Sequence, residues 1–276
     1  MLGLRQKVGA LYARVRASGG RVARRRLPVR SDQLQFFPRH PGPHPSRWEF
    51  PSYLDNPRCN WLQALKDLYA QPITFPASLS PEAGLFLHGL IRNVQPRVVV
   101  EVGSFVSVST HWIAAALLEQ GRRPGEAFVH CFDDFGPIHK GPWRDEELLE
   151  GRLEWVTDRL SRAGLIDYVS LHPGDSSTSV QLAHDLLREQ GGVDFAFIDG
   201  DHSTPGAVAD FHAVEPVLKT GGFVLLHDTF PDECGGHQGP RHILDHIDTL
   251  GQGLYEKIDL YLSPLNYGMG LLRRIG

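Results

Sequence analysis

Two short apolar segments that each end in ionisable residues constrain the fold of this chain most strongly. The first segment, residues 194–198 (DFAFI), is followed directly by Asp199-Gly-Asp-His202. The second, residues 223–226 (FVLL), runs into His227-Asp-Thr229. Continuous apolar runs of this length are typical of strands that are buried on both faces of a parallel sheet. We therefore predict two parallel strands whose ends bring both polar groups to one edge of a sheet.

The segment between these strands has the pattern of a helix. Ser203 or Thr204 is a favourable N-cap residue, and Gly221-Gly222 is predicted to end the helix. Apolar residues recur at helical spacing between them, namely Val208, Phe211, Val214 and Val217. In open α/β sheets, ligands bind at the carboxyl ends of the strands. Aspartate and glycine are also common in ordinary turns, but two acidic turns at one edge favour a ligand site.

The rest of the chain supplies the other elements of an α/β fold. Further strands are predicted over 97–101, 127–132 and 168–171, and an antiparallel hairpin over 255–262 and 268–274. Helices are predicted over 60–70, 80–93, 110–119, 143–162, 179–189 and 243–250. The sequence thus predicts a mostly parallel seven-stranded sheet that ends in an antiparallel hairpin.

The first 57 residues differ in composition from the remainder. Residues 1–30 contain nine Lys or Arg and no acidic residue, and the segment 27–57 holds seven prolines. We predict a basic and proline-rich extension (1–57), a helical lead-in (58–95) and an α/β domain (96–276) that carries the motifs described below. The basic part is either a solvated extension or a peripheral membrane contact. No nucleic-acid partner is expected, because the rest of the chain is acidic.

Cysteine usage and hydropathy indicate a cellular setting. The chain has three cysteines, too few for a disulfide framework, and Cys131 lies inside a predicted strand. No apolar run is long enough to cross a bilayer. We expect a cytoplasmic protein, and a homo-oligomer is compatible with the sequence.

The first predicted strand leads into a loop suited to a small anionic ligand. Gly103 lets the backbone approach a ligand closely, and Ser104, Ser107, Ser109 and Thr110 place hydroxyls and N–H groups at a helix N-terminus. Such a terminus favours a carboxylate. The dinucleotide fingerprint G-x-G-x-x-G and the Walker A loop are both missing from the sequence.

Two more strand ends carry polar residues. The strand over 127–132 ends at Asp133-Asp134, where an acid can bind both hydroxyls of a ribose; a solvated turn is the alternative. Asp175 and Ser176 follow the strand over 168–171, where they either face an adenine or cap the next helix.

These motifs resemble those of class I methyltransferases that use S-adenosylmethionine (SAM), in particular the subgroup called methyltransferase 24, related to macrocin and rhamnosyl O-methyltransferases. The resemblance rests on Glu101-x-Gly-Ser-Phe, Ile198-Asp-Gly-Asp-His, Gly221-Gly222 and Leu226-His-Asp. Ser107 departs from it, because a second glycine is common there. The resemblance implies a Rossmann-like fold and a cofactor site formed by Glu101, Gly103, Ser104, Ser109, Asp133, Asp175, Ser176 and Asp199.

The resemblance also implies O-methyl transfer to a small molecule or a saccharide. His202 is our candidate general base, because an imidazole titrates near neutral pH; a purely structural hydrogen bond is the alternative. Asp199 is predicted to be catalytic and, with His227 and Asp228, to hold a divalent cation such as Mg²⁺ or Mn²⁺. A metal-free site is the alternative.

Two competing functions use the same residues. A metal-dependent oxygenase would employ Asp199, His202 and His227 as ligands. A non-catalytic cofactor-binding protein would not depend on His202.

Overall fold

The computed structural model describes residues 47–140, 146–231, 238–260 and 267–276. Its strands are β1 (Val98–Val102), β2 (Phe128–Asp133), β3 (Val169–Pro173), β4 (Val193–Ile198), β5 (Leu218–His227), β6 (Tyr255–Leu260) and β7 (Met269–Arg274). Its α-helices are α2 (Asn60–Tyr69), α3 (Pro81–Val94), α4 (Val108–Glu119), α5 (Arg152–Ala163), α6 (Ser176–Leu182), α7 (His184–Glu189), α8 (Thr204–Val214) and α9 (Gly239–Leu250).

The strands form one sheet in the order β3-β2-β1-β4-β5-β7-β6. The first five strands in this order pair in parallel, whereas β7 is antiparallel to both β5 and β6. The prediction of a mostly parallel seven-stranded sheet with a C-terminal antiparallel hairpin is confirmed.

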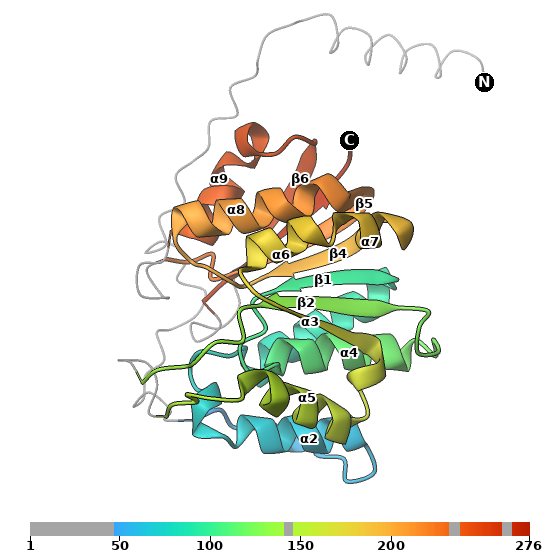
Figure 1. Ribbon diagram of the computed structural model, residues 1–276, viewed down its shortest axis with the longest axis vertical. Helices are drawn as coiled ribbons and strands as arrows, with labels where there is room; N and C mark the ends of the chain where they lie inside the picture. The colour runs from blue at the N-terminus through green and yellow to red at the C-terminus, as the bar shows by residue number, and fades with distance from the viewer. Residues whose placement is uncertain (1–46, 141–145, 232–237, 261–266) are drawn as a thin grey trace, which may run out of the picture. The chain divides into compact units, whose positions relative to one another are not determined.

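Helices cover both faces of this sheet (Figure 1). Helices α2 to α5 lie on one face and α6 to α9 on the other. Strand β1 shows why its sequence is apolar throughout: Val99 joins one core cluster, while Val98, Val100 and Val102 join the other. Because successive side chains of a strand point to opposite faces, a strand between two helical layers buries every position.

The strand order reverses between β1 and β4. From β1 the chain continues to β2 on one side, and from β4 it continues to β5 on the other. Such a switch point leaves a crevice beyond the carboxyl ends of the two central strands, where ligands of open α/β sheets bind. The predicted site residues lie at or after the ends of the five parallel strands β1 to β5.

The predicted bounds of three helices are wrong. The helix predicted over 243–250 begins earlier, at Gly239. The helix predicted over 143–162 begins only at Arg152, because Leu148 instead forms an antiparallel bridge with Ile138 and Gly151 takes a left-handed conformation (φ 66°) before the helix. The helix predicted to end at Gly221-Gly222 ends at Val214, ahead of Pro216. The two glycines belong to β5, where a Cβ on Gly222 would lie 2.9 Å from the Lys219 carbonyl oxygen.

The helix predicted over 179–189 is two helices. They are α6 and α7, which meet at Ala183. Ala183 has φ −86° and ψ 0°, outside the helical range, so the helical path changes direction there.

Only part of the predicted extension 1–57 lies within the described residues. Trp48 is buried, its indole N–H donates to the Thr74 carbonyl (3.2 Å), and its ring meets Phe75 edge-on. The basic segment 1–30 lies outside the described residues. In the ranges that the structure describes, every helix is too short or too polar to cross a membrane.

Candidate functional site

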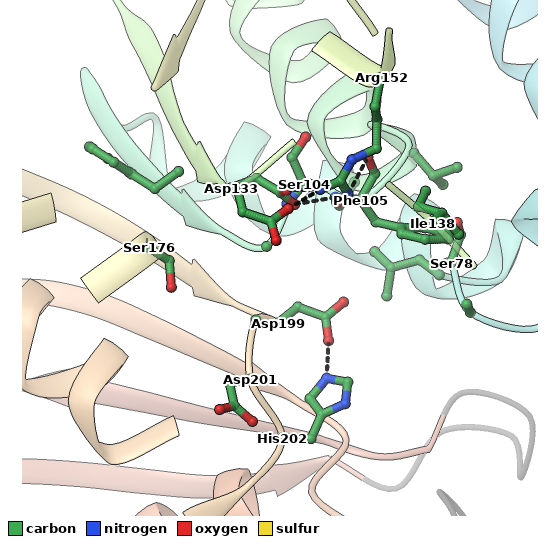
Figure 2. Close-up of a pocket in the computed structure, with 18 of the residues that line it drawn as sticks. Ser78, Ser104, Phe105, Asp133, Ile138, Arg152, Ser176, Asp199, Asp201 and His202 are labelled. Carbon is green, nitrogen blue, oxygen red and sulfur yellow. Dashed lines mark hydrogen bonds and ion pairs between the residues drawn. The ribbon is translucent and has the colours of Figure 1, made fainter. Parts of the chain in front are cut away.

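A cavity of about 650 Å³ lies at the carboxyl ends of the central strands (Figure 2). Its lining comes from the stretch before α3 (77–79), the β1–α4 loop, the end of β2, the start of α6 and the turn Asp199–His202. Figure 2 shows Asp133 and Arg152 on one side of the cavity and Asp199 and His202 on the other. The sequence analysis expected Asp133, Asp199 and His202 at one edge of the sheet, and the structure places them there.

Gly103 begins the loop between β1 and α4 and has φ 84°. A Cβ on this residue would lie 2.3 Å from the Asp199 carbonyl oxygen and 2.8 Å from the Gly200 Cα atom. No side chain fits at such a distance, so glycine is required here for two loops of the protein to meet. The sequence analysis attributed this glycine to the approach of a ligand; the structure supplies a second reason within the chain itself.

The N-terminus of α4 faces the cavity. Its N-cap residue Ser107 takes a left-handed conformation (φ 65°) and makes no side-chain hydrogen bond to the first turn. Val108 and Ser109 line the cavity, so first-turn N–H groups remain available at the positive end of the helix dipole. Across the loop, Ser78 lines the same cavity, and its hydroxyl has no hydrogen-bond partner among the described residues. This arrangement fits a carboxylate.

Ser78 was not singled out from the sequence. It precedes the capping residue of α3, and nothing in the local pattern distinguishes it from other loop serines. Only the tertiary structure brings it opposite the β1–α4 loop.

Glu101 lies beneath that loop and is fully buried. Its Oε2 accepts a hydrogen bond from Thr110 Oγ1 (2.6 Å), which also contacts Ser104 Oγ (2.8 Å). Its other oxygen has no hydrogen-bond partner among the described residues. Burial raises the pKa of Glu101 to about 7, because no cation compensates the desolvated charge, although hydrogen bonds from Ser109 and Thr110 act in the opposite direction.

A pH-dependent stability follows from this pKa. Between the ordinary value of 4.5 and about 7, the folded state keeps a proton that the unfolded state has released. Stability is therefore lost as pH rises through this window, by about 3 kcal/mol at ~1.4 kcal/mol per pH unit. The side chain of a Glu101→Gln variant does not titrate. The free energy of unfolding of this variant, relative to that of the wild type, is therefore expected to be about 3 kcal/mol higher at pH 8 than at pH 4.5. Urea unfolding at both pH values tests this, and parallel profiles of the two proteins would contradict it.

Asp133 organises the cavity wall at the end of β2. Its Oδ2 accepts from the N–H groups of Ser104 (2.9 Å) and Phe105 (2.8 Å). Its Oδ1 accepts from the Phe135 N–H (2.8 Å) and from Arg152 Nη2 (2.6 Å). Burial raises the pKa of Asp133, and Arg152 opposes that effect. A contact between Asp133 and the hydroxyls of a ribose would come in addition to these four interactions. This contact stays a prediction.

Arg152 joins three parts of the cavity wall, and the sequence analysis did not identify it. Its buried guanidinium also pairs with Asp134, and Nη1 donates to the Phe105 carbonyl (3.4 Å). An arginine at the start of a helix after a long loop carries no signal of such a role in the sequence.

Asp175 and Ser176 line the cavity at the start of α6. Asp175 caps this helix by accepting from the Thr178 N–H (2.9 Å), and the Thr178 interactions lower the pKa of Asp175. Ser176 Oγ donates to Asp210 Oδ1 (2.6 Å). Capping therefore occurs, as one of the two alternatives proposed from the sequence, and an adenine contact remains a prediction.

Four ionisable residues from β4 and β5 meet at the far side of the cavity. Asp199 Oδ1 lies 3.3 Å from His202 Nε2 and 3.1 Å from His227 Nδ1. Asp228 lies 3.1 Å from the same two nitrogens through its two oxygens. Asp228 also has φ 57°, an unfavourable conformation for a residue with a side chain, which is typical of functional sites.

The charges in this cluster stabilise one another. Burial would raise the pKa of Asp199, but His227 and His202 outweigh it and hold the pKa below its usual value. Burial would lower the pKa of both imidazoles, but Asp199 and Asp228 outweigh it and raise them. An arrangement of two carboxylates and two imidazoles can exchange protons or hold a cation.

The structure groups Asp199, His202 and Asp228 as candidate metal ligands, with ligand atoms all within 4.8 Å of one another. The sequence analysis instead combined Asp199 and Asp228 with His227. His227 is buried next to both carboxylates, and its Nε2 has no hydrogen-bond partner among the described residues. Two carboxylates and an imidazole at this spacing fit a divalent cation.

The mostly parallel sheet, its antiparallel C-terminal hairpin and the cavity at the switch point give this chain the Rossmann-like fold of solved O-methyltransferases. Comparison with protein families adds that residues 100–229 match the family model described as a methyltransferase domain. The matched segment runs from β1 to the end of β5 and includes most of the cavity residues described above.

Individual relatives are distant. A caffeoyl-CoA O-methyltransferase from Stellaria longipes is 26% identical over 164 residues, which cover 58% of this chain and 57% of that protein. The chain thus matches little more than half of the length of this curated relative. The solved O-methyltransferase TomG from Streptomyces achromogenes, in complex with SAM, has a TM-score of 0.54 at 19% identity and covers 83% of this chain and 92% of its own. The O-methyltransferase from Bacillus cereus in complex with SAH has a TM-score of 0.50 at 19% identity, covering 77% and 87%.

Proposed function

We propose that this chain is a SAM-dependent O-methyltransferase that acts on a hydroxyl group of a small molecule or a sugar unit, in line with the macrocin and rhamnosyl O-methyltransferase resemblance. One observation carries the proposal: Asp199 and His202 of the ionisable cluster line the same cavity as the β1–α4 loop and the N-terminus of α4. Relatives named as O-methyltransferases support it.

The cofactor would lie along the carboxyl edge of the sheet. We place its methionine end against Gly103, Ser104 and Ser109, with the carboxylate at the uncapped N-terminus of α4. Glu101 supports this loop from beneath through Thr110. The ribose would lie toward Asp133 and the adenine toward Asp175 and Ser176, which line the same cavity. When bound, SAM supplies an electrophilic methyl group on a sulfonium.

Methyl transfer to a hydroxyl requires the protein to align two atoms and to remove one proton. We assign the proton to His202, because its imidazole lines the cavity and lies between Asp199 and Asp228. The two carboxylates stabilise the imidazolium that forms when the base accepts the proton. Asp199 thereby orients the base and lowers the cost of the proton transfer.

A divalent cation fits the same cluster. Asp199 and Asp228 would supply oxygens, and His227 would supply a nitrogen so that His202 remains the base; His202 is the alternative nitrogen ligand. A mixed oxygen and nitrogen set suits Mn²⁺ better than Mg²⁺. A bound cation would lower the pKa of an acceptor hydroxyl.

Calorimetry with S-adenosylhomocysteine (SAH), with and without Mn²⁺ or Mg²⁺, tests this function directly. We expect SAH to bind with micromolar affinity and Mn²⁺ to bind more tightly than Mg²⁺. A protein that binds no SAH at millimolar concentration is not the enzyme proposed here.

The base assignment gives a separate prediction. His202→Ala is expected to slow methyl transfer about 10²- to 10⁴-fold, the usual range for loss of a general base. SAH affinity should change less than threefold, because this side chain acts on the acceptor. An acceptor is first found by screening hydroxylated compounds. The rate at which SAH is produced and the affinity for SAH are then both measured for the wild type and for the variant. Equal losses in rate and in SAH affinity would show a structural role instead.

The oxygenase alternative is less well supported. An oxygenase would use two imidazoles and one carboxylate. The residues whose ligand atoms lie within reach of one cation are instead two carboxylates and one imidazole, namely Asp199, Asp228 and His202. Stoichiometric iron in the purified protein would favour the oxygenase, and an unchanged biological role of His202→Ala would favour a non-catalytic cofactor-binding protein.

A further inference from the structure

Asp210 is a buried carboxylate just behind the cavity wall. It lies on α8, is 2% exposed, and forms no ion pair with any described residue. Burying a carboxylate without a cation costs free energy that an apolar residue at a helix interface would not. Stability of the α6–α8 packing therefore does not explain why an acid stands at this position.

Asp210 contacts residues that line the cavity. Its Oδ1 accepts a hydrogen bond from Ser176 Oγ (2.6 Å). Its Oδ2 lies against Gly200, where a Cβ would be only 2.8 Å away. The backbone of Asp201 lies close enough to this carboxyl to oppose burial, which raises the pKa of Asp210. A single side chain thus contacts the start of α6 and the turn that carries Asp199 and His202.

The hydrogen bond to Asp210 determines whether the Ser176 hydroxyl acts as a donor or as an acceptor toward the cavity. A hydroxyl has one proton to donate, and Ser176 donates it to the carboxylate. Its oxygen is then left with lone pairs and acts as an acceptor toward the cavity. The exocyclic amino group of adenine is a donor, so the two are complementary.

We propose that Asp210 is a positioning residue that holds Ser176 as a hydrogen-bond acceptor for the amino group of the cofactor's purine and supports the Gly200–Asp201 turn from behind. This inference rests on the proposed SAM-dependent function. It assigns to Asp210 a share in cofactor recognition although its side chain does not line the cavity.

A double-mutant cycle tests the coupling. SAH affinity is measured by calorimetry for the wild type, Ser176→Ala, Asp210→Ala and the double variant. We expect each single change to weaken binding about tenfold, as for loss of one hydrogen bond to a buried partner. The double variant should be no weaker than Asp210→Ala alone, because Asp210 acts through Ser176. Additive losses, or an Asp210→Ala variant with wild-type affinity, would overturn the proposal.

A modified ligand distinguishes purine recognition from a structural role of Asp210. A loss of stability alone would not change the preference of the protein between two ligands that differ only in the purine. S-inosylhomocysteine carries a carbonyl in place of the amino group, so the wild type should prefer SAH over it by about tenfold or more. Asp210→Ala should lose this preference, whereas Asp210→Asn should keep most of it, because its amide oxygen can still accept from Ser176. A preference unchanged in Asp210→Ala would refute the proposed recognition.

Glu215→Ala is the matched control. Glu215 is an equally buried acid, but it accepts from Gln252 N–H (2.6 Å) and Tyr255 Oη (3.0 Å), away from the cavity. This variant should lose stability without a change in SAH affinity. If the wild type itself binds no SAH, the proposed function fails. If the wild type binds SAH and the Asp210 variants, like Glu215→Ala, lose stability but keep their SAH affinity, this inference alone fails.

Discussion

Gly103→Ala is expected to lose about 3–5 kcal/mol of stability and most of its SAH affinity, because it combines backbone strain with a steric clash. The added Cβ would lie 2.3 Å from the Asp199 carbonyl oxygen, at a position held by backbone on both sides. Flexible side chains can move away from such a contact, but here β1 and β4 are adjacent paired strands, and the Asp199 N–H is bonded to the Val102 carbonyl (2.8 Å). Relief of the clash would separate the two loops that form the cavity.

Urea unfolding and SAH calorimetry measure the two effects of this substitution. Gly121→Ala provides the control, because Gly121 also has positive φ (71°) but nothing lies within 4 Å of an added Cβ. Its loss should be about 1 kcal/mol, the cost of the backbone conformation alone, with SAH binding unchanged. If both variants lost the same stability, the close approach of the two loops would not be the reason for glycine at position 103.

The parts of the fold that could be predicted from the sequence are those that depend on local pattern. Residues 195–198 and 223–226 are continuous apolar runs because these parts of β4 and β5 lie between two helical layers, where burial on both faces leaves no polar position. Asp194, at the start of β4, is only half-buried and pairs with Lys219. The ionisable residues after these runs had to lie at one edge, because parallel strands end on the same side. The meeting of Asp199, His202 and Asp228 follows from that geometry.

Residues whose role depends on distant parts of the chain could not be predicted. Arg152 reaches Asp133 and Phe105 only after the loop that begins at Asp134 folds back through the Ile138–Leu148 bridge. Asp210 has helical neighbours of ordinary pattern, and its contact with Ser176 spans 34 residues. Hydropathy patterns and capping rules depend only on neighbouring residues in the sequence. They therefore cannot predict a contact between residues that are distant in the sequence, and such contacts are seen only in the structure.

The same distinction explains the displaced start of α5. Leu148, Leu149, Leu153 and Val156 continue a helical pattern through residue 151, and the pattern predicts one long helix. The tertiary pairing of Leu148 with Ile138 competes with that helix and prevails, because it satisfies both backbone groups of each residue (2.7 and 2.9 Å). Helix propensity is a weak preference that tertiary hydrogen bonds can override.

Asp199→Asn is expected to reduce methyl transfer by about 10³-fold or more, because the substitution removes a charge that acts on the base and on any bound cation at once. The side chain keeps its shape, so the fold should persist. The negative charge that holds His202 and His227 in their raised pKa states is lost, and one oxygen ligand of the proposed cation becomes a neutral amide. Mn²⁺ affinity should fall at least tenfold, which calorimetry measures without knowledge of the acceptor.

Asp194→Asn is the matched control for this change. Asp194 lies at the opposite end of the same strand, where it pairs with Lys219 (2.6 Å) and accepts from the N–H groups of Arg97 and Val98. Its pKa is lowered because these interactions outweigh burial, so its substitution should cost stability but leave Mn²⁺ binding and turnover intact. A loss of Mn²⁺ affinity in both variants would trace the effect to the sheet as a whole. A loss confined to Asp199→Asn locates the chemistry at the carboxyl end of β4, because Asp194 lies near the opposite end of that strand, away from the cavity.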